Sequence, residues 1–309
     1  MKIIFFGASS QIAKSLIKKF SQDPQNQLTF FVRNLDVFAN WLVNKKISHD
    51  QSDIKTYSEF SINDEVDVII NCIGIGDPAQ AIKISSSIDD TTNKFDDLVL
   101  HYLEFNPKTK YFFLSSGIAY GDIFSAPARN YNQQNIKISS IKQEDQYSIS
   151  KIKAENKHRK LSKFSIIDIR IFSFLSDEIN INNSFFITDA LRAIKEDVVF
   201  LTNMNNITRD YIGVDDLYQL IEILIPIDGL NTIVDTYSKN PIDKFTILDF
   251  LKSSFGLRYQ FQEDFKAINA SGIKDHYYSR NFIAEDFGYS PNFSSLEVIE
   301  MVANKILKP

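Results

Sequence analysis

The chain has 309 residues, 44% of them hydrophobic and 24% charged, and a formal net charge of −5. That length supports a full hydrophobic core, while one cysteine (Cys72) and four scattered histidines exclude a disulfide scaffold and leave almost no ligands for a metal. The acidic balance argues against a nucleic-acid binder, because affinity for a phosphate backbone relies on Lys and Arg. No apolar run reaches the roughly 18 residues of a membrane span, so we expect a globular cytoplasmic protein with neither membrane nor nucleic-acid partners.

In the first half of the chain, short apolar runs alternate with amphipathic stretches, which is typical of βαβ units. Each run is rich in Ile, Phe and Val, as expected for strands buried on both faces of a sheet. The expected strands are Lys2–Phe6, Leu28–Val32, Val66–Asn71, Lys110–Leu114 and Ser165–Ile171. The helices expected between them are Ile12–Phe20, Val37–Val43, Asn93–Glu104 and Tyr147–Leu161. We therefore predict an α/β fold of the Rossmann type with a doubly wound parallel sheet.

After Ile171 the alternation gives way to shorter segments. We expect a helix over Ile187–Lys195, a strand over Val198–Leu201, a helix over Leu217–Leu224 and mixed elements from about Ile242. This change of pattern predicts a larger lobe from residues 1–172 plus about 207–240. A smaller α/β lobe is expected from about 173–206 plus 241–309.

The first expected strand runs directly into Gly7–Ala13, and a helix follows. A tight turn of small residues at this place aims the N-terminal amides of the helix at an anion, which in this fold is a dinucleotide pyrophosphate. Of the three glycines typical of such turns only Gly7 is present, with Ser10 and Ala13 as small substitutes. The segment predicts a dinucleotide site, and an ordinary strand-to-helix turn is the alternative.

Arg33 follows the second expected strand, at the position where NAD sites carry an acid that holds the ribose hydroxyls. The segment Phe31–Asn34 contains no acid. An Arg there accommodates a 2′-phosphate, so Arg33 predicts NADP(H) as the preferred cofactor, with NAD(H) as the other possibility. The alternative for this residue is a solvated surface Arg.

Tyr147 is followed four residues later by Lys151 on an expected helix, so the two side chains share one face. An ammonium group there favours the phenolate, whose ordinary pKa is about 10, and makes Tyr147 a usable acid or base nearer neutral pH. A surface pair is the alternative. The segment Ser115–Gly121 supports the catalytic interpretation, because a hydroxyl at the carboxyl end of a parallel strand lies where such sheets bind ligands.

Taken together, these motifs resemble an extended short-chain dehydrogenase/reductase of the NAD(P)-dependent epimerase/dehydratase type, which works on nucleotide sugars. The resemblance spans essentially the whole chain and rests on Gly7–Ala13, Ser115–Gly121, Tyr147–Lys151 and Arg209–Asp216. Two departures stand out: Gly213 replaces the usual His, and Ser173 replaces an Asn that many members have. In this family the larger lobe binds the cofactor and the smaller lobe binds the substrate.

The resemblance implies a role for each matching residue. Tyr147 would be the catalytic acid/base, Lys151 its activator and a ribose ligand, and Ser116 the hydroxyl that bonds the reacting oxygen. The implied cofactor-binding residues are Gly7, Ser10, Gln11 and Ile12 at the pyrophosphate, Arg33 as the residue that selects the cofactor, Asp53 and Ile54 at the adenine, and Cys72, Ile73 and Gly74 beside the ribose and nicotinamide, together with Tyr147 and Lys151. The implied substrate contacts are Ser116, Gly117, Ser173 and Arg209, the last of these at the diphosphate of a nucleotide sugar. No metal is implied.

The family also implies a homodimer through the helices Asn93–Glu104 and Tyr147–Leu161. The alternative is that each of these helices simply covers the sheet.

Gly117 and Ile118 stand where the sugar dehydratases of this family carry an Asp-Glu pair and the GDP-fucose synthases a Cys. The resemblance therefore implies hydride transfer without further acid/base residues. Our leading hypothesis is NADPH-dependent reduction of the C4 keto group of a nucleotide-linked 4-keto-6-deoxyhexose. One alternative is a nucleotide-sugar 4-epimerase with tightly bound NAD, and another is a non-catalytic NADP-binding sensor or scaffold.

Overall fold

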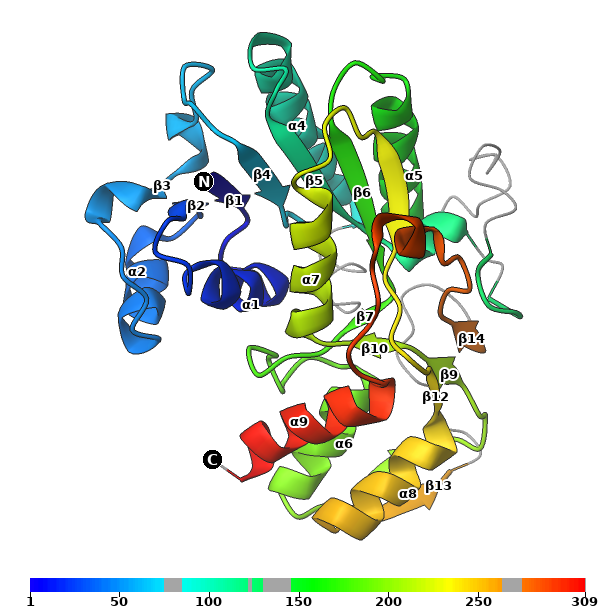
Figure 1. The fold of residues 1–309 in the computed structure, drawn as a ribbon. Helices are drawn as coiled ribbons and strands as arrows, with labels where there is room; N and C mark the ends of the chain where they lie inside the picture. The colour runs from blue at the N-terminus through cyan, green and yellow to red at the C-terminus, as the bar shows by residue number, and fades with distance from the viewer. Residues whose placement is uncertain (75–84, 122–123, 130–145, 263–273, 309) are drawn as a thin grey trace.

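The computed structural model describes residues 1–74, 85–121, 124–129, 146–262 and 274–308, with side chains for all of these except 85–92 and 146. Seven strands form one sheet in the order β11-β6-β5-β4-β1-β2-β3, and every neighbouring pair is parallel (Figure 1). The strands are β1 (Lys2–Phe6), β2 (Gln27–Phe31), β3 (Ile54–Lys55), β4 (Val68–Asn71), β5 (Lys110–Ser116), β6 (Ile166–Ile171) and β11 (Thr232–Asp235). This is the α/β Rossmann fold that the sequence predicts.

The register of the central strands places their carboxyl ends at one edge of the sheet. Phe6 is level with Phe31 on one side and with Asn71 on the other, and Asn71 is level with Phe113. The segments that leave β1, β2, β4 and β5 therefore emerge side by side. In open parallel sheets this edge is where ligands bind.

Helices cover both faces of the sheet (Figure 1), and alternate residues of the buried strands pack against opposite helix layers. One face is covered by α1 (Gln11–Phe20), α2 (Leu35–Asn44) and α7 (Val214–Leu224), and the other by α4 (Ser85–Phe105) and α5 (Gln146–Arg159). In β1, for example, Ile3 and Phe5 belong to the first core and Ile4 and Phe6 to the second.

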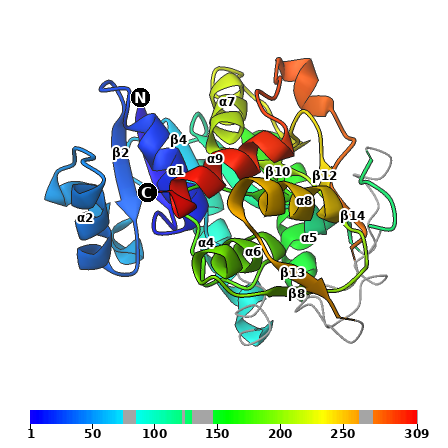
Figure 2. The same cartoon turned by 90° about the horizontal axis from the view of Figure 1, so that it is seen from below.

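The remaining helices, α6 (Phe186–Lys195), α8 (Lys244–Phe255) and α9 (Ser295–Leu307), build a second lobe around a core of their own (Figure 2). Short strands accompany them: β7 (Ser173–Phe174), β8 (Phe200–Thr202), β9 (Thr208–Arg209), β10 (Tyr211–Ile212), β12 (Ile242–Asp243), β13 (Tyr259–Phe261) and β14 (His276–Tyr277). The 3-10 helices are η1 (Gln51–Asp53), η2 (Tyr57–Glu59), η3 (Gly117–Tyr120) and η6 (Ile283–Phe287).

Helix α9 closes the core of the smaller lobe. Val298, Ile299, Val302 and Ala303 are buried in it, and Ser295 at its start accepts a hydrogen bond from the Tyr211 amide at 2.8 Å. The division into two lobes at the expected residue numbers stays a prediction. Within it, Tyr289 departs from the expected lobe, because its ring packs into the core of the sheet.

Candidate active site

Gly7 forms the tight turn between β1 and α1. Its φ is +71°, and a Cβ added there would lie 3.1 Å from both the carbonyl carbon and the oxygen of Cys72. A glycine is therefore required by both conformation and space. Ser10 caps the helix by accepting a hydrogen bond from the Ala13 amide at 3.3 Å, so the N-terminus of α1 opens at the binding edge of the sheet.

The segment after β4 lies against this turn. The Cys72 amide donates to the Phe6 carbonyl at 2.9 Å, and the Ile73 amide donates to the Asn71 side chain at 3.0 Å. A Cβ on Gly74 would lie 3.8 Å from the Nζ of Lys151. The structure thus brings the two glycine-containing segments and Lys151 together.

Lys151 is 1% exposed and lies at the carboxyl end of β5. Its Nζ donates to the Leu114 carbonyl at 2.8 Å, 4.3 Å from the ring centre of Phe113 and 5.9 Å from that of Tyr147. Burial lowers the pKa of Lys151 to about 8, and the carboxylate of Glu155 opposes part of that shift. The ammonium can therefore gain or lose its proton near neutral pH.

Glu155, one helical turn after Lys151, fastens α5 to the neighbouring strands. Its carboxylate accepts from the Ser115 hydroxyl at 2.5 Å and from Nε of Arg170 at 3.0 Å. Arg170 is itself 2% exposed, so this is a buried ion pair. Lys151 and Glu155 together hold the last residues of β5 in place.

Ser116 ends β5 and begins η3. Its Oγ accepts from the Ile118 amide at 3.4 Å and lies 3.2 Å from the hydroxyl of Tyr277. A Cβ on Gly117 would lie 2.5 Å from the ring of Phe172, so position 117 has no room for a side chain.

Tyr277 is a residue of this site that sequence reasoning missed. It lies 161 residues after Ser116. No local pattern links the two, and only the packing of β14 onto the site reveals the contact.

Arg209 lies beside Tyr277, because β9 and β14 pair with these two residues in register. Its Nη1 donates to the carbonyls of Thr208 and Lys274, at 2.9 and 2.7 Å. Its guanidinium carbon lies 5.8 Å from the ring centre of Tyr277, and Nζ of Lys274 lies 4.5 Å from the same centre. Two cations therefore flank the ring that reaches Ser116. Ser173 is farther along this lobe, paired with Tyr211.

Arg33 is exposed just after β2, at the same edge of the sheet. Tyr57, which the sequence analysis did not select, packs against the last residues of β1 and β2. The ring stacks on Phe6 at 6.0 Å and on Phe31 at 6.5 Å. Burial raises the pKa of Tyr57, with Arg33 opposing the shift.

Gln11 and Ile12 occupy the first turn of α1. Nε2 of Gln11 donates to the hydroxyl of Ser176 at 3.3 Å, which ties the turn to the chain segment that enters the smaller lobe. Ile12 packs against the core under the sheet.

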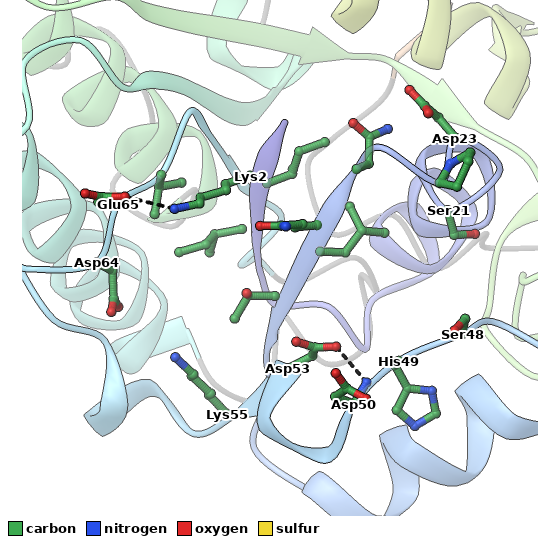
Figure 3. Close-up of a pocket in the computed structure, with 18 residues that line it drawn as sticks. Lys2, Ser21, Asp23, Ser48, His49, Asp50, Asp53, Lys55, Asp64 and Glu65 are labelled. Carbon is green, nitrogen blue, oxygen red and sulfur yellow. Dashed lines mark hydrogen bonds and ion pairs between the residues drawn. The ribbon is translucent and has the colours of Figure 1, made fainter.

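Ile54 begins β3, which pairs with the end of β2, and Asp53 directly precedes it; their contact with the adenine stays a prediction. Asp53 lines a surface pocket of about 580 Å³, to which Lys2, Gln27 and Lys55 also contribute (Figure 3). Its carboxylate accepts from the Asp50 amide at 2.7 Å, and Ile54 is buried in the core.

Across the ranges given above, no cluster of three or more His, Cys, Asp or Glu side chains could hold a metal ion. None of the helices in the same part of the chain combines the length and the apolar character needed to cross a membrane.

Comparisons with known proteins bear on this arrangement. Residues 3–227 match the NAD dependent epimerase/dehydratase family. Among curated proteins, no significant match was found.

Solved structures with the same fold include three epimerases. UDP-glucuronic acid 4-epimerase from Bacillus cereus, in complex with UDP-glucuronic acid and NAD, has a TM-score of 0.79 and 14% identity, covering 100% of this chain and 99% of that one. UDP-glucose 4-epimerase from Bifidobacterium longum, with NAD+ and UDP, has a TM-score of 0.74 and 15% identity, covering 99% and 97%. UDP-N-acetylglucosamine 4-epimerase from Methanobrevibacter ruminantium M1, with UDP-N-acetylmuramic acid, has a TM-score of 0.73 and 12% identity, covering 99% and 96%. At these identities the likeness concerns the fold.

Proposed function

Because the chain belongs to the NAD-dependent epimerase/dehydratase family, we propose that it is an NAD-dependent 4-epimerase acting on a UDP-linked sugar. Family membership agrees with the resemblance seen in the motifs and makes the chain an NAD-dependent enzyme. The structural neighbours support the finer proposal, since they are 4-epimerases whose complexes contain NAD, UDP or a UDP-linked sugar.

The observation that carries the proposal is the position of Lys151. It is buried at the end of β5, with its Nζ within reach of Gly74 on one side and of the Tyr147 ring on the other. A cation in this position can assist Tyr147 while the tyrosine removes a proton from a hydroxyl group and later returns it. The carbon that carries this hydroxyl is oxidised and then reduced again.

The cradle around Gly7 fits a dinucleotide. The residue has the positive φ of such turns, its lack of a Cβ lets the backbone of Cys72 approach, and the N-terminus of α1 follows at once. Gly7, Ser10, Cys72 and Gly74 would hold NAD, which when bound supplies the hydride acceptor and donor.

The protein's own residues then handle the proton. Tyr147 takes the proton from the C4 hydroxyl of the sugar and returns it when the carbon is reduced. The ammonium of Lys151 stabilises the phenolate. Ser116 donates a hydrogen bond to the same sugar oxygen, and Arg209 binds the diphosphate.

The reductase that the sequence analysis favoured is the second candidate. One observation favours it: Arg33 is exposed at the end of β2, where no acid is present to hold the ribose hydroxyls of NAD. A reductase would exchange NADPH at every turnover, whereas an epimerase regenerates its cofactor and can retain it.

The test is to identify the dinucleotide released when freshly purified protein is denatured, and to assay interconversion of C4-epimeric UDP-hexoses and UDP-uronic acids. We expect near-stoichiometric NAD and turnover that Tyr147→Phe lowers by at least about 10³-fold with cofactor content unchanged. Tyr218→Phe is the matched control, since Tyr218 packs on Phe20 away from the site. If the purified protein instead contains no bound cofactor, prefers NADPH and reduces a 4-keto sugar, its function is that of the reductase and not of the epimerase.

A further inference from the structure

Tyr277 reaches the catalytic serine from the smaller lobe. It is 9% exposed, and its hydroxyl is 3.2 Å from Oγ of Ser116. In the described part of the chain this hydrogen bond joins a strand of the smaller lobe, β14, to the end of β5, so it links the two halves of the site.

Two aromatic rings and two cationic side chains lie around the ring of Tyr277. Phe124 packs edge-on at 4.8 Å between ring centres, and Phe172 lies tilted at 5.2 Å. Lys274 and Arg209 place their cations at 4.5 and 5.8 Å from the ring centre. An aromatic ring fixed in this way presents its hydroxyl at a defined point.

The position of the Tyr277 hydroxyl matters because Ser116 can form only a few hydrogen bonds. A serine hydroxyl has one proton and two acceptor lone pairs. The Ile118 amide donates to Oγ at 3.4 Å, which uses one lone pair. If Tyr277 donates to the second, the proton of Ser116 is left for the substrate.

We propose that Tyr277 is a positioning residue that donates its hydroxyl proton to Ser116 and so keeps the Ser116 proton directed at the reacting oxygen of the sugar. This inference rests on the proposed function, in which Ser116 stabilises that oxygen. Burial raises the pKa of Tyr277, so its hydroxyl keeps the proton that it donates across the pH range in which the enzyme would work.

The sharpest test is a double-mutant cycle of Tyr277→Phe and Ser116→Ala. Tyr277→Phe keeps the ring contacts and removes only the hydroxyl. We expect kcat to fall about tenfold, with KM and the Kd of UDP unchanged within about twofold. Because Tyr277 acts through Ser116, the double variant should be no slower than Ser116→Ala alone.

Tyr278→Phe is the matched control, since the next tyrosine in the chain pairs its ring with His276 instead. It should leave kcat and KM unchanged. An unchanged kcat in Tyr277→Phe, a rise in KM alone, or additive losses in the cycle would each overturn the proposal.

The same double-mutant cycle can be measured on the midpoint temperature of thermal unfolding. This measurement tests the hydrogen bond between the two hydroxyls in the absence of substrate. Non-additive shifts support the contact between the two hydroxyls, and additive shifts overturn it. A wild-type protein with no activity on UDP sugars but a non-additive melting cycle would refute the proposed function while confirming the hydrogen bond.

Discussion

Lys151 owes its chemistry to its surroundings in the fold. The motif predicted its pairing with Tyr147, but not its burial or its bond to the Leu114 carbonyl. Ordinary lysines keep their charge to a pH near 10, so a pKa of about 8 follows from loss of solvent around the ammonium.

This lowered pKa predicts a pH-dependent cofactor affinity. As the pH rises from 7 to 9, Lys151 loses its proton, and NAD binding should weaken about threefold to tenfold. Titration of NAD by calorimetry at several pH values measures this change.

The Lys151→Met variant should bind NAD weakly at every pH, and its affinity should not fall as the pH rises. Lys252→Met, on α8, should behave as the wild type does. A wild-type affinity that stays flat from pH 7 to 9 would contradict the prediction.

Among the site residues, those in local motifs were predictable and those in long-range contacts were not. Gly7, Ser116 and Tyr147 stand in recognisable segments, whereas Tyr277 contacts a residue far away in the sequence. The role of Asp53 stays a prediction: it directly precedes β3, which begins at Ile54.

Helix α5 carries more than Tyr147 and Lys151. His158, fully buried, has Nδ1 2.7 Å from Asp168 of β6 and Nε2 2.7 Å from Asp96 of α4. With a carboxylate at each ring nitrogen, the imidazole is doubly protonated and donates to both. This cluster joins two helices and a strand under the catalytic face.

The cluster predicts that stability falls in mildly alkaline solution. Burial alone would lower the pKa of His158, but Asp168 and Asp96 outweigh it and raise the pKa to about 9. The folded state thus keeps a proton that the unfolded chain loses near pH 6.5. The stabilisation is complete below that pH and disappears as the pH rises through 9, a change on the order of 2 kcal/mol.

Urea unfolding at pH 6, 7.5 and 9 measures this loss. His158→Gln should flatten the pH profile, while His101→Gln, on the exposed side of α4, should keep it. If His158→Gln keeps the wild-type pH profile, another group is responsible for the loss of stability.

The sequence predicts where these helices lie better than it predicts which of their residues are buried. The expected helix Ile12–Phe20 differs from α1 by one residue, because its apolar residues recur on one face. On α5, however, Ser148, Ser150, Lys151, Glu155 and His158 are all buried. Their partners come from distant strands and helices, so a pattern based on apolar residues does not locate them. The strands β3 and β11 were missed because their partners in the sheet, rather than their own sequences, define them.

The two lobes are fastened beside the nucleotide turn by residues 176–178. Glu178 accepts from Nε1 of Trp41 at 3.0 Å and pairs with Lys45 at 2.8 Å and Lys18 at 3.2 Å, with 6% of its side chain exposed. Asp177 pairs with Lys18 at 2.7 Å. The segment 176–178 therefore ties the smaller lobe to α1 and α2, the helices that follow β1 and β2.

Replacement of Glu178 should loosen this junction. Glu178→Gln removes the charge that the two lysines face, and we expect a loss of about 2 kcal/mol in the free energy of unfolding. Trp41 is the sole tryptophan of the chain, so a red shift of its fluorescence reports the change directly.

Glu297→Gln serves as a control, because that carboxylate only caps α9 at the surface. An unshifted tryptophan spectrum in Glu178→Gln, together with wild-type stability, would argue against the junction.

The homodimer through α4 and α5 stays a prediction. The described outer residues of these helices include Asp97, His101 and Glu104 on one and Lys153 and Asn156 on the other. Phe105, the last residue of α4, is also exposed.

The place of α9 in the core of the smaller lobe has a consequence for biosynthesis. The sheet has all its strands once Asp235 has left the ribosome, whereas the smaller lobe must wait for Ala303. At roughly 5–20 residues per second this leaves an interval of several seconds. During it, the sheet has all its strands while the apolar faces of α6 and α8 still lack the cover of α9.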